Sequence, residues 1–215
     1  GWQYDQIQES GDTMSRSLVG VLLVSFAGTM SAGDWPQFRG PSASGIGDGA
    51  KPPVQWDATN GTHILWKTEV PGLAVSSPIV WGDRVFVTTA VSSDPKQSLR
   101  IGLYGDTDPV NDKSAHQWKV LAIDKKTGKI LWDQTAHHGT PKTKRHPKSS
   151  QASPTPVTNG KVVIAWFGSE GLYAYNFDGK LLWKNDLGIQ NAGWFFDPDS
   201  EWGAASSPPR TSARR

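Results

Sequence analysis

The sequence AIDKKTGKILW, at residues 122–132, decides the fold of this chain. It reads as a strand, a turn that closes on Gly128, and a second strand that ends at Trp132. A shortened copy, AYNFDGKLLW, follows at residues 174–183 and ends at a tryptophan in the same way. An internal repeat of such hairpins predicts a β-propeller, because each unit needs its neighbours to bury its two faces.

Turn chemistry supports this prediction elsewhere in the chain. Gly82-Asp83, Asn159-Gly160 and Asp178-Gly179 each lie between apolar runs. Gly and Asn accept positive φ at low cost, so these pairs select tight hairpins. The runs at 84–88 and 162–167 are apolar at both odd and even positions, which indicates strands buried on both faces and therefore sheets stacked face to face.

The strands group into units. A lone closing strand is expected at 63–70, and an insertion at 92–115 reads as a loop because of its Asp-Pro and Gly-Asp pairs. A Ser-Pro pair at 207–208 marks the start of a third unit. The sequence therefore predicts an all-β partial propeller of about two to three four-stranded antiparallel blades. The predicted strands are 77–81, 84–91, 117–124 and 130–135 in the first blade, and 155–158, 161–167, 171–176 and 180–186 in the second.

The N-terminal region predicts export. Residues 1–13 precede Met14 and read as translated upstream sequence. Residues 14–33 have the plan of a secretory signal peptide, with a positive start, a short apolar run at 18–29 and small residues after it. The alternative is an N-terminal membrane anchor. We expect a periplasmic or extracellular protein with no stable membrane span after the signal is cleaved.

The remaining boundaries follow from the repeat. Residues 34–208 are expected to form an incomplete propeller, and residues 209–215 form an aberrant tail that could not continue as a buried strand. We interpret the chain as a truncated or frameshifted product; a nonfunctional reading frame is a further alternative. Open blade edges and apolar faces would then favour self-association.

The composition excludes several classes of protein. The 215 residues include 11 Trp, 23 Gly and 15 Pro, which suits many aromatic contacts and tight turns. A formal net charge of +2 gives no general attraction to nucleic acid, and no nucleic-acid partner is expected. Without Cys, the chain has no disulfide, thiolate metal site, cysteine nucleophile or lipid-modified cysteine.

The repeat resembles that of pyrroloquinoline-quinone-type propellers, which have about seven or eight blades. In that family the tryptophan of one blade docks on the peptide plane of the next. The resemblance implies that the tryptophans are structural, whereas the alternative is a platform for a planar ligand. The implied docking residues are Ala122, Gly128 and Trp132, then Ala174, Gly179 and Trp183 with one residue deleted, and Trp66 on the closing strand.

The segment DWPQFRGP at 34–41 is similar to the start of exported, non-dehydrogenase members, which resemble the lipoprotein that assists outer-membrane-protein assembly. This resemblance implies a non-catalytic binding or scaffold role with no cofactor. No nucleophile elbow, phosphate-binding loop or zinc-binding helix motif is present. The alternative is a fragment of a dehydrogenase that uses pyrroloquinoline quinone and calcium. The absence of Cys departs from both the lipoprotein and the quinone dehydrogenases.

The loop at 137–150, which follows Trp132, is the candidate binding site. Loops between blades lie at one mouth of a propeller channel, and a basic loop there could bind a phosphate, a carboxylate or an acidic glycan of an unidentified partner. The alternative is a solvated connector. Its histidines lack a carboxylate at ligand spacing, so no metal site is expected. The candidate ligand-binding residues are Lys142, Lys144, Arg145, His146 and Lys148.

The equivalent loop after Trp183, at 191–202, is aromatic and acidic. It could offer a stacking platform to a ligand, or it could pair with the basic loop. We favour pairing, because opposite charges on neighbouring loops attract.

Overall fold

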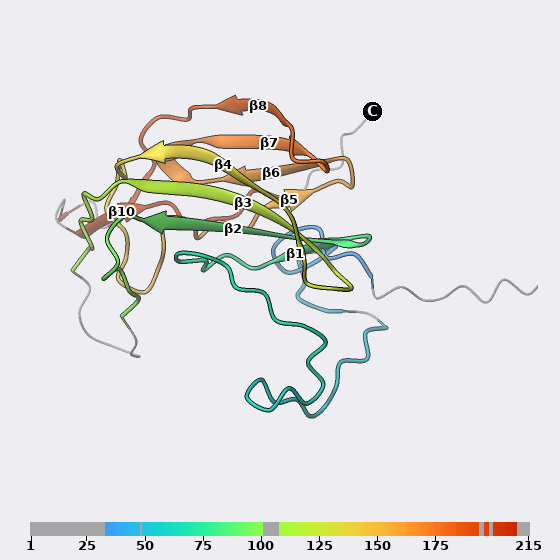
Figure 1. Cartoon of the computed structure of the whole chain (residues 1–215). Helices are drawn as coiled ribbons and strands as arrows, with labels where there is room; N and C mark the ends of the chain where they lie inside the picture. The colour runs from blue at the N-terminus through green and yellow to red at the C-terminus, as the bar shows by residue number, and fades with distance from the viewer. Residues whose placement is uncertain (1–32, 48, 101–107, 194–195, 198–199, 210–215) are drawn as a thin grey trace, which may run out of the picture. The chain divides into compact units, whose positions relative to one another are not determined.

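The computed structural model describes residues 33–47, 49–100, 108–193, 196–197 and 200–209 (Figure 1). The predicted upstream segment and all of the predicted signal peptide except Gly33 lie outside these residues, as does most of the predicted tail. Within the described ranges, no helix is long and apolar enough to cross a membrane.

The first four-stranded sheet is formed by β1 (Ile79–Trp81), β2 (Arg84–Ser92), β3 (His116–Asp124) and β4 (Ile130–Gly139), in that spatial order. All neighbours are antiparallel. The pairing of β3 with β4 shifts register at two places, between Trp118 and Lys119 and between Ala122 and Ile123. These irregularities increase the local twist of the two strands.

The second four-stranded sheet repeats this plan. It contains β5 (Val157–Thr158), β6 (Val162–Trp166), β7 (Leu172–Asn176) and β8 (Leu181–Asn185), again in sequence order and antiparallel. A short 3-10 turn, η1 (Gly168–Glu170), connects β6 to β7. The strands of both sheets lie where the turn chemistry predicts them.

A third, two-stranded sheet pairs β9 (Asn191–Gly193) with β10 (Glu201–Gly203). The sequence predicted a loop here, and that prediction is wrong at both ends of the segment. Three antiparallel sheets of four, four and two strands confirm an all-β partial propeller. The sheets described do not close into a ring.

The two four-stranded sheets, β1–β4 and β5–β8, lie against each other (Figure 1), and two apolar clusters join them. Trp118 on β3 is fully buried, and its indole N–H donates to the carbonyl oxygen of Gln151 at 3.0 Å. The runs that are apolar at both parities lie in these two sheets, but in β6 the burial alternates: Val163 and Ala165 are buried, whereas the residues between and beside them are half-buried. Burial on both faces is therefore only partly met in β6. The first cluster joins Ala90, Trp118 and Val120 to Ala152, Ala165, Phe167, Tyr173 and Tyr175; the second joins Ile79, Phe86 and Ala122 to Val163.

Two boundaries differ from the sequence prediction. Residues 64–70 form no strand. A strand needs a sheet edge to pair with, and the nearest pairings on either side of this segment are the isolated bridges Asp57–Thr62 and Leu73–Ala90. The loop after Trp132 begins later than predicted, since β4 continues to Gly139 and pairs there with the start of β3.

Candidate functional site

Each of two tryptophans lies on a turn glycine of a neighbouring unit. Trp66 donates its indole N–H to the carbonyl oxygen of Lys125 at 2.9 Å, and Trp132 donates to that of Phe177 at 2.8 Å. A β-carbon on Gly128 would lie 2.6 Å from the Trp66 ring, and one on Gly179 would lie 2.9 Å from the Trp132 ring. Only glycine leaves room for the indole at these positions.

The alanines of the repeat face its tryptophans across the sheet. Ala122 pairs with Trp132, and Ala174 pairs with Trp183; both alanines are fully buried. Trp183 differs from Trp132 in its surroundings, because it is 44% exposed and every residue of β8 is exposed.

One further tryptophan contact was not foreseen from the sequence. A β-carbon on Gly160 would lie 2.5 Å from the ring of Trp81. The Asn-Gly turn at 159–160 was recognised as a hairpin, but Trp81 precedes a turn rather than closing a repeat, so the pattern gave no signal for this contact.

The predicted basic loop does not present its five side chains at one point. The ammonium group of Lys142 donates to the carbonyl oxygen of Ser169 at 2.9 Å and lies 3.3 Å from a carboxylate oxygen of Asp186. Lys148 is exposed, whereas Arg145 is only 4% exposed. The loop therefore contributes side chains to several different environments.

Arg145 is part of the interior. Its guanidinium donates to the carbonyl oxygens of Ser98 at 2.9 Å and Ser149 at 3.0 Å, and its Nε has no hydrogen-bond partner within the described structure. Burial lowers the pKa of Arg145, and the charge of Asp112 acts in the opposite direction. A buried guanidinium held mainly by carbonyl oxygens fixes the loop in place.

A buried carboxyl group lies under the start of the loop. Glu170 of η1 is 4% exposed, and one of its carboxylate oxygens accepts the backbone N–H of Lys142 at 2.8 Å. Burial raises the pKa of Glu170 despite this hydrogen bond and the charge of Lys142. Sequence reasoning missed this residue, since a single Glu after Gly-Ser carries no recognisable pattern.

The β9–β10 hairpin packs on the basic loop. The backbone N–H of Gly203 donates to the carbonyl oxygen of Lys144 at 2.9 Å, and the rings of Trp202 and His146 meet edge to face at 5.0 Å. His146 also accepts the backbone N–H of Lys148 through Nδ1. The two loops thus contact each other through the backbone and through aromatic rings.

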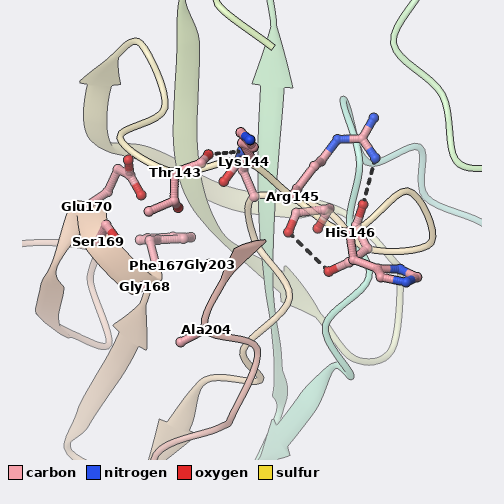
Figure 2. Close-up of a pocket in the computed structure, with 13 residues that line it drawn as sticks. Thr143, Lys144, Arg145, His146, Phe167, Gly168, Ser169, Glu170, Gly203 and Ala204 are labelled. Carbon is pink, nitrogen blue, oxygen red and sulfur yellow. Dashed lines mark hydrogen bonds between the residues drawn. The ribbon is translucent and has the colours of Figure 1, made fainter. Parts of the chain in front are cut away.

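The space beneath the loop is nearly filled. Figure 2 shows Glu170 and Ser169 on one side of Gly203 and the Arg145 side chain extending toward the other. The enclosed volume is about 10 Å³, which is about what a single water molecule needs. This space is too small for a ligand.

A larger cavity, which we call the first cavity, opens beside it. Its volume is about 260 Å³. Three lysines lie on its wall against one carboxylate, Glu201, which leaves a formal excess of two positive charges. Trp202 and Ile189 add apolar surface. The lining residues are Asn111, Lys113, Lys142, Thr143, Lys144, Ile189, Asn191, Glu201 and Trp202.

The described side chains do not provide a ligand set for a metal ion. No three His, Asp or Glu residues in the described ranges lie close enough together to hold a metal ion. His137 and His138 are successive residues of β4, so they point to opposite faces of the sheet. Burial lowers the pKa of His137, with added effects from Lys142 and His138.

Antiparallel sheets that bury turn glycines under tryptophan rings define the class of β-propeller repeat proteins. The family model described as "Outer membrane protein assembly factor BamB" matches residues 46–193, and the chain belongs to this family of pyrroloquinoline-quinone-like repeats. The resemblance found in the sequence is thereby confirmed. No curated protein matches the chain.

Proposed function

We propose that this chain is a non-catalytic binding or scaffold unit of an exported protein, and that it binds an anionic group in the first cavity. The carrying observation is the placement of Lys113, Lys142 and Lys144 around a cavity that also exposes Trp202. The family description, an assembly factor, supports a role in which the bound group belongs to another protein.

The chemistry of the cavity favours a carboxylate or phosphate. The hydrogen bond to the carbonyl oxygen of Ser169 orients the ammonium group of Lys142, and the carboxylate of Asp186 compensates part of its positive charge. Lys113 and Lys144 add two further positive charges to the wall of the same cavity. Glu201 accepts a hydrogen bond from the side-chain amide of Asn191 at 3.1 Å, so its charge is partly engaged within the hairpin. Exposed ion pairs are screened by salt, so binding should weaken as the ionic strength rises.

Trp202 supplies the second part of the site. Its ring is half-buried against His146, which holds it in position beside the lysines. An aromatic face next to ammonium groups suits a ligand that carries an apolar group close to its anionic group. A short acidic peptide with an aromatic residue meets both requirements.

The test is a titration of the full chain with acetyl-Phe-Glu-amide, followed by NMR chemical shifts of the tryptophan indole N–H groups. We expect Trp202 to shift, and Lys144→Gln to weaken binding about fivefold, the effect of one exposed ion pair. Lys161→Gln, in the exposed turn before β6, is the matched control and should leave affinity unchanged.

Two results would contradict the proposal. The first is an absence of shifts at Trp202, or an equal loss of affinity in both lysine variants. The second concerns the non-catalytic role: dye-linked alcohol oxidation by the full chain in the presence of pyrroloquinoline quinone and calcium would overturn it.

A further inference from the structure

A second cavity, of about 360 Å³, adjoins the first. Asn111 and Lys113 line both cavities, so the two cavities are neighbours at this point of the chain. The second cavity lies between the insertion that follows β2 and the basic loop, which the Val110–Arg145 bridge holds together by two backbone hydrogen bonds of 2.8 and 3.1 Å.

The second cavity is also electropositive. Among the described residues that line it, Lys96, Arg100, Lys113 and Arg145 stand against two carboxylates, which leaves a formal excess of two positive charges. Asp94, the first of these carboxylates, accepts the backbone N–H of Lys96 at 2.9 Å. It is therefore already held by its own turn.

The second carboxylate, Asp112, is held by hydrogen-bond donors of its own loop and lies 3.6 Å from Nε2 of His116. It accepts the backbone N–H of Ser114 at 2.8 Å and the side-chain amide of Gln97 at 2.8 Å. Burial opposes its ionisation, but the hydrogen bonds from Ser114 and Ser92 and the neighbouring His116 together lower the pKa of Asp112. Among the described residues, neither carboxylate of this cavity accepts a hydrogen bond from the side chain of a lysine or arginine that lines it.

Arg145 connects the walls of the second cavity. Its guanidinium binds the carbonyl oxygens of Ser98 in the insertion and Ser149 in the basic loop. Its Nε is a buried donor that lacks a hydrogen-bond partner within the described residues. A buried donor of this kind costs about 1–3 kcal/mol unless a ligand oxygen satisfies it.

We infer that the two cavities form one groove, and that its occupant is an extended acidic peptide with two separated anionic groups. This inference rests on the proposed function, because the first cavity is one half of the groove. Trp202 and Ile189 fit an apolar residue at one end, and the cations around Arg100 fit acidic residues at the other. The amide side chain of Asn111, at the junction, can pair with a peptide backbone in both directions.

The experiment compares three probes on the full chain by fluorescence anisotropy. The short probe is acetyl-Phe-Glu-amide, and the long probe is acetyl-Phe-Glu-Ser-Gly-Ser-Glu-Glu-amide. The third probe is the long peptide with its last two Glu replaced by Gln. We expect the long acidic probe to bind about fivefold more tightly than the Gln peptide, as one or two added exposed ion pairs would produce.

Two variants assign this gain to the groove. Lys96→Gln should reduce the gain of the long probe and leave the short probe unchanged, because Lys96 lines only the second cavity. Lys144→Gln should weaken both probes, because Lys144 lines the first. Lys161→Gln should affect neither probe.

The outcomes separate this inference from the proposed function. Equal affinity for the long probe and its Gln counterpart, with binding of the short probe retained, would overturn the groove and leave the first cavity as the site. Failure of every probe to bind would overturn both. Tighter binding of a heparin oligosaccharide than of the long probe would overturn the peptide as occupant.

Discussion

The indole of Trp132 lies against Gly179 in the turn between β7 and β8, and its N–H donates to the carbonyl oxygen of Phe177 two residues earlier. Gly179 has a φ of +83°, a conformation that L-residues avoid. The turn therefore needs glycine for two separate reasons: the backbone conformation and the space beneath the ring.

We predict that Gly179→Ala lowers the free energy of unfolding by about 2–5 kcal/mol, from about 1–2 for the left-handed backbone and about 1–3 for the clash with the indole. Denaturant unfolding measures the loss. The matched control is Gly82→Ala in the β1–β2 turn, where φ is +58° and nothing lies within 4 Å of an added β-carbon. That variant should lose only the backbone part. Equal losses would mean that the indole imposes no steric requirement.

The two tryptophans that close the repeat should contribute differently to stability. Trp132 packs against Phe86 and Tyr175 at ring distances of 5.9 and 6.1 Å, so we expect Trp132→Ala to cost about 3–5 kcal/mol. Trp183 occupies the same place in its repeat but is 44% exposed, and Trp183→Ala should cost less than about 1 kcal/mol.

The comparison of these two variants in urea is informative because the residue type and repeat position are the same. A loss for Trp183→Ala as large as that for Trp132→Ala would show that β8 packs against something in solution. A second copy of the chain would then be the first partner to examine, by sedimentation.

The turns and most strands of the fold could be predicted from local chemistry. Gly82-Asp83, Asn159-Gly160 and Asp178-Gly179 specify tight turns by themselves, and runs of β-branched residues beside them specify strands. The strand expected at 63–70 failed because strand formation depends on a partner edge, and no local pattern reports whether such an edge exists. The β9–β10 pairing was missed for the same reason, since its two strands have only three residues each.

The candidate site was only partly predictable. The cluster of cations in the basic loop identified the region, but charge alone did not distinguish Lys144, which is half-buried on the wall of the first cavity, from Arg145, which is only 4% exposed. The buried guanidinium of Arg145 donates to a carbonyl oxygen of the insertion, that of Ser98, which lies 47 residues away in the chain. Long-range contacts of this kind cannot be predicted from the local sequence.

The buried carboxyl of Glu170 predicts a pH dependence of stability. Its pKa is raised above the ordinary value of 4.5, so the folded chain binds more protons than the unfolded chain as the pH rises past 4.5. The free energy of unfolding should therefore fall through that range until the pKa of the folded state is passed. Glu170→Gln keeps an acceptor for the N–H of Lys142 and should remove this fall.

Thermal unfolding between pH 4 and pH 8 checks the prediction, with the exposed Glu69→Gln as control. The difference in unfolding free energy between Glu170→Gln and the original chain should grow toward neutral pH, whereas the control should show no such trend. A constant difference across the range would mean that Glu170 titrates alike in the folded and unfolded states.

Arg145 should control the order of the insertion more than the stability of the two main sheets. Arg145→Lys keeps the charge but loses the planar fork that binds Ser98 and Ser149 together, and we expect a local cost of about 1–3 kcal/mol. Hydrogen exchange should accelerate at the N–H groups of Arg100 and Val110, which donate to Pro147 and Arg145 at 3.0 and 2.8 Å. Exchange within β2 and β3 should stay unchanged, because their ladder does not depend on the guanidinium. Uniformly faster hydrogen exchange in both sheets would instead mean that Arg145 stabilises the whole fold. Unchanged exchange at Arg100 would mean that the guanidinium of Arg145 does not hold the insertion in place.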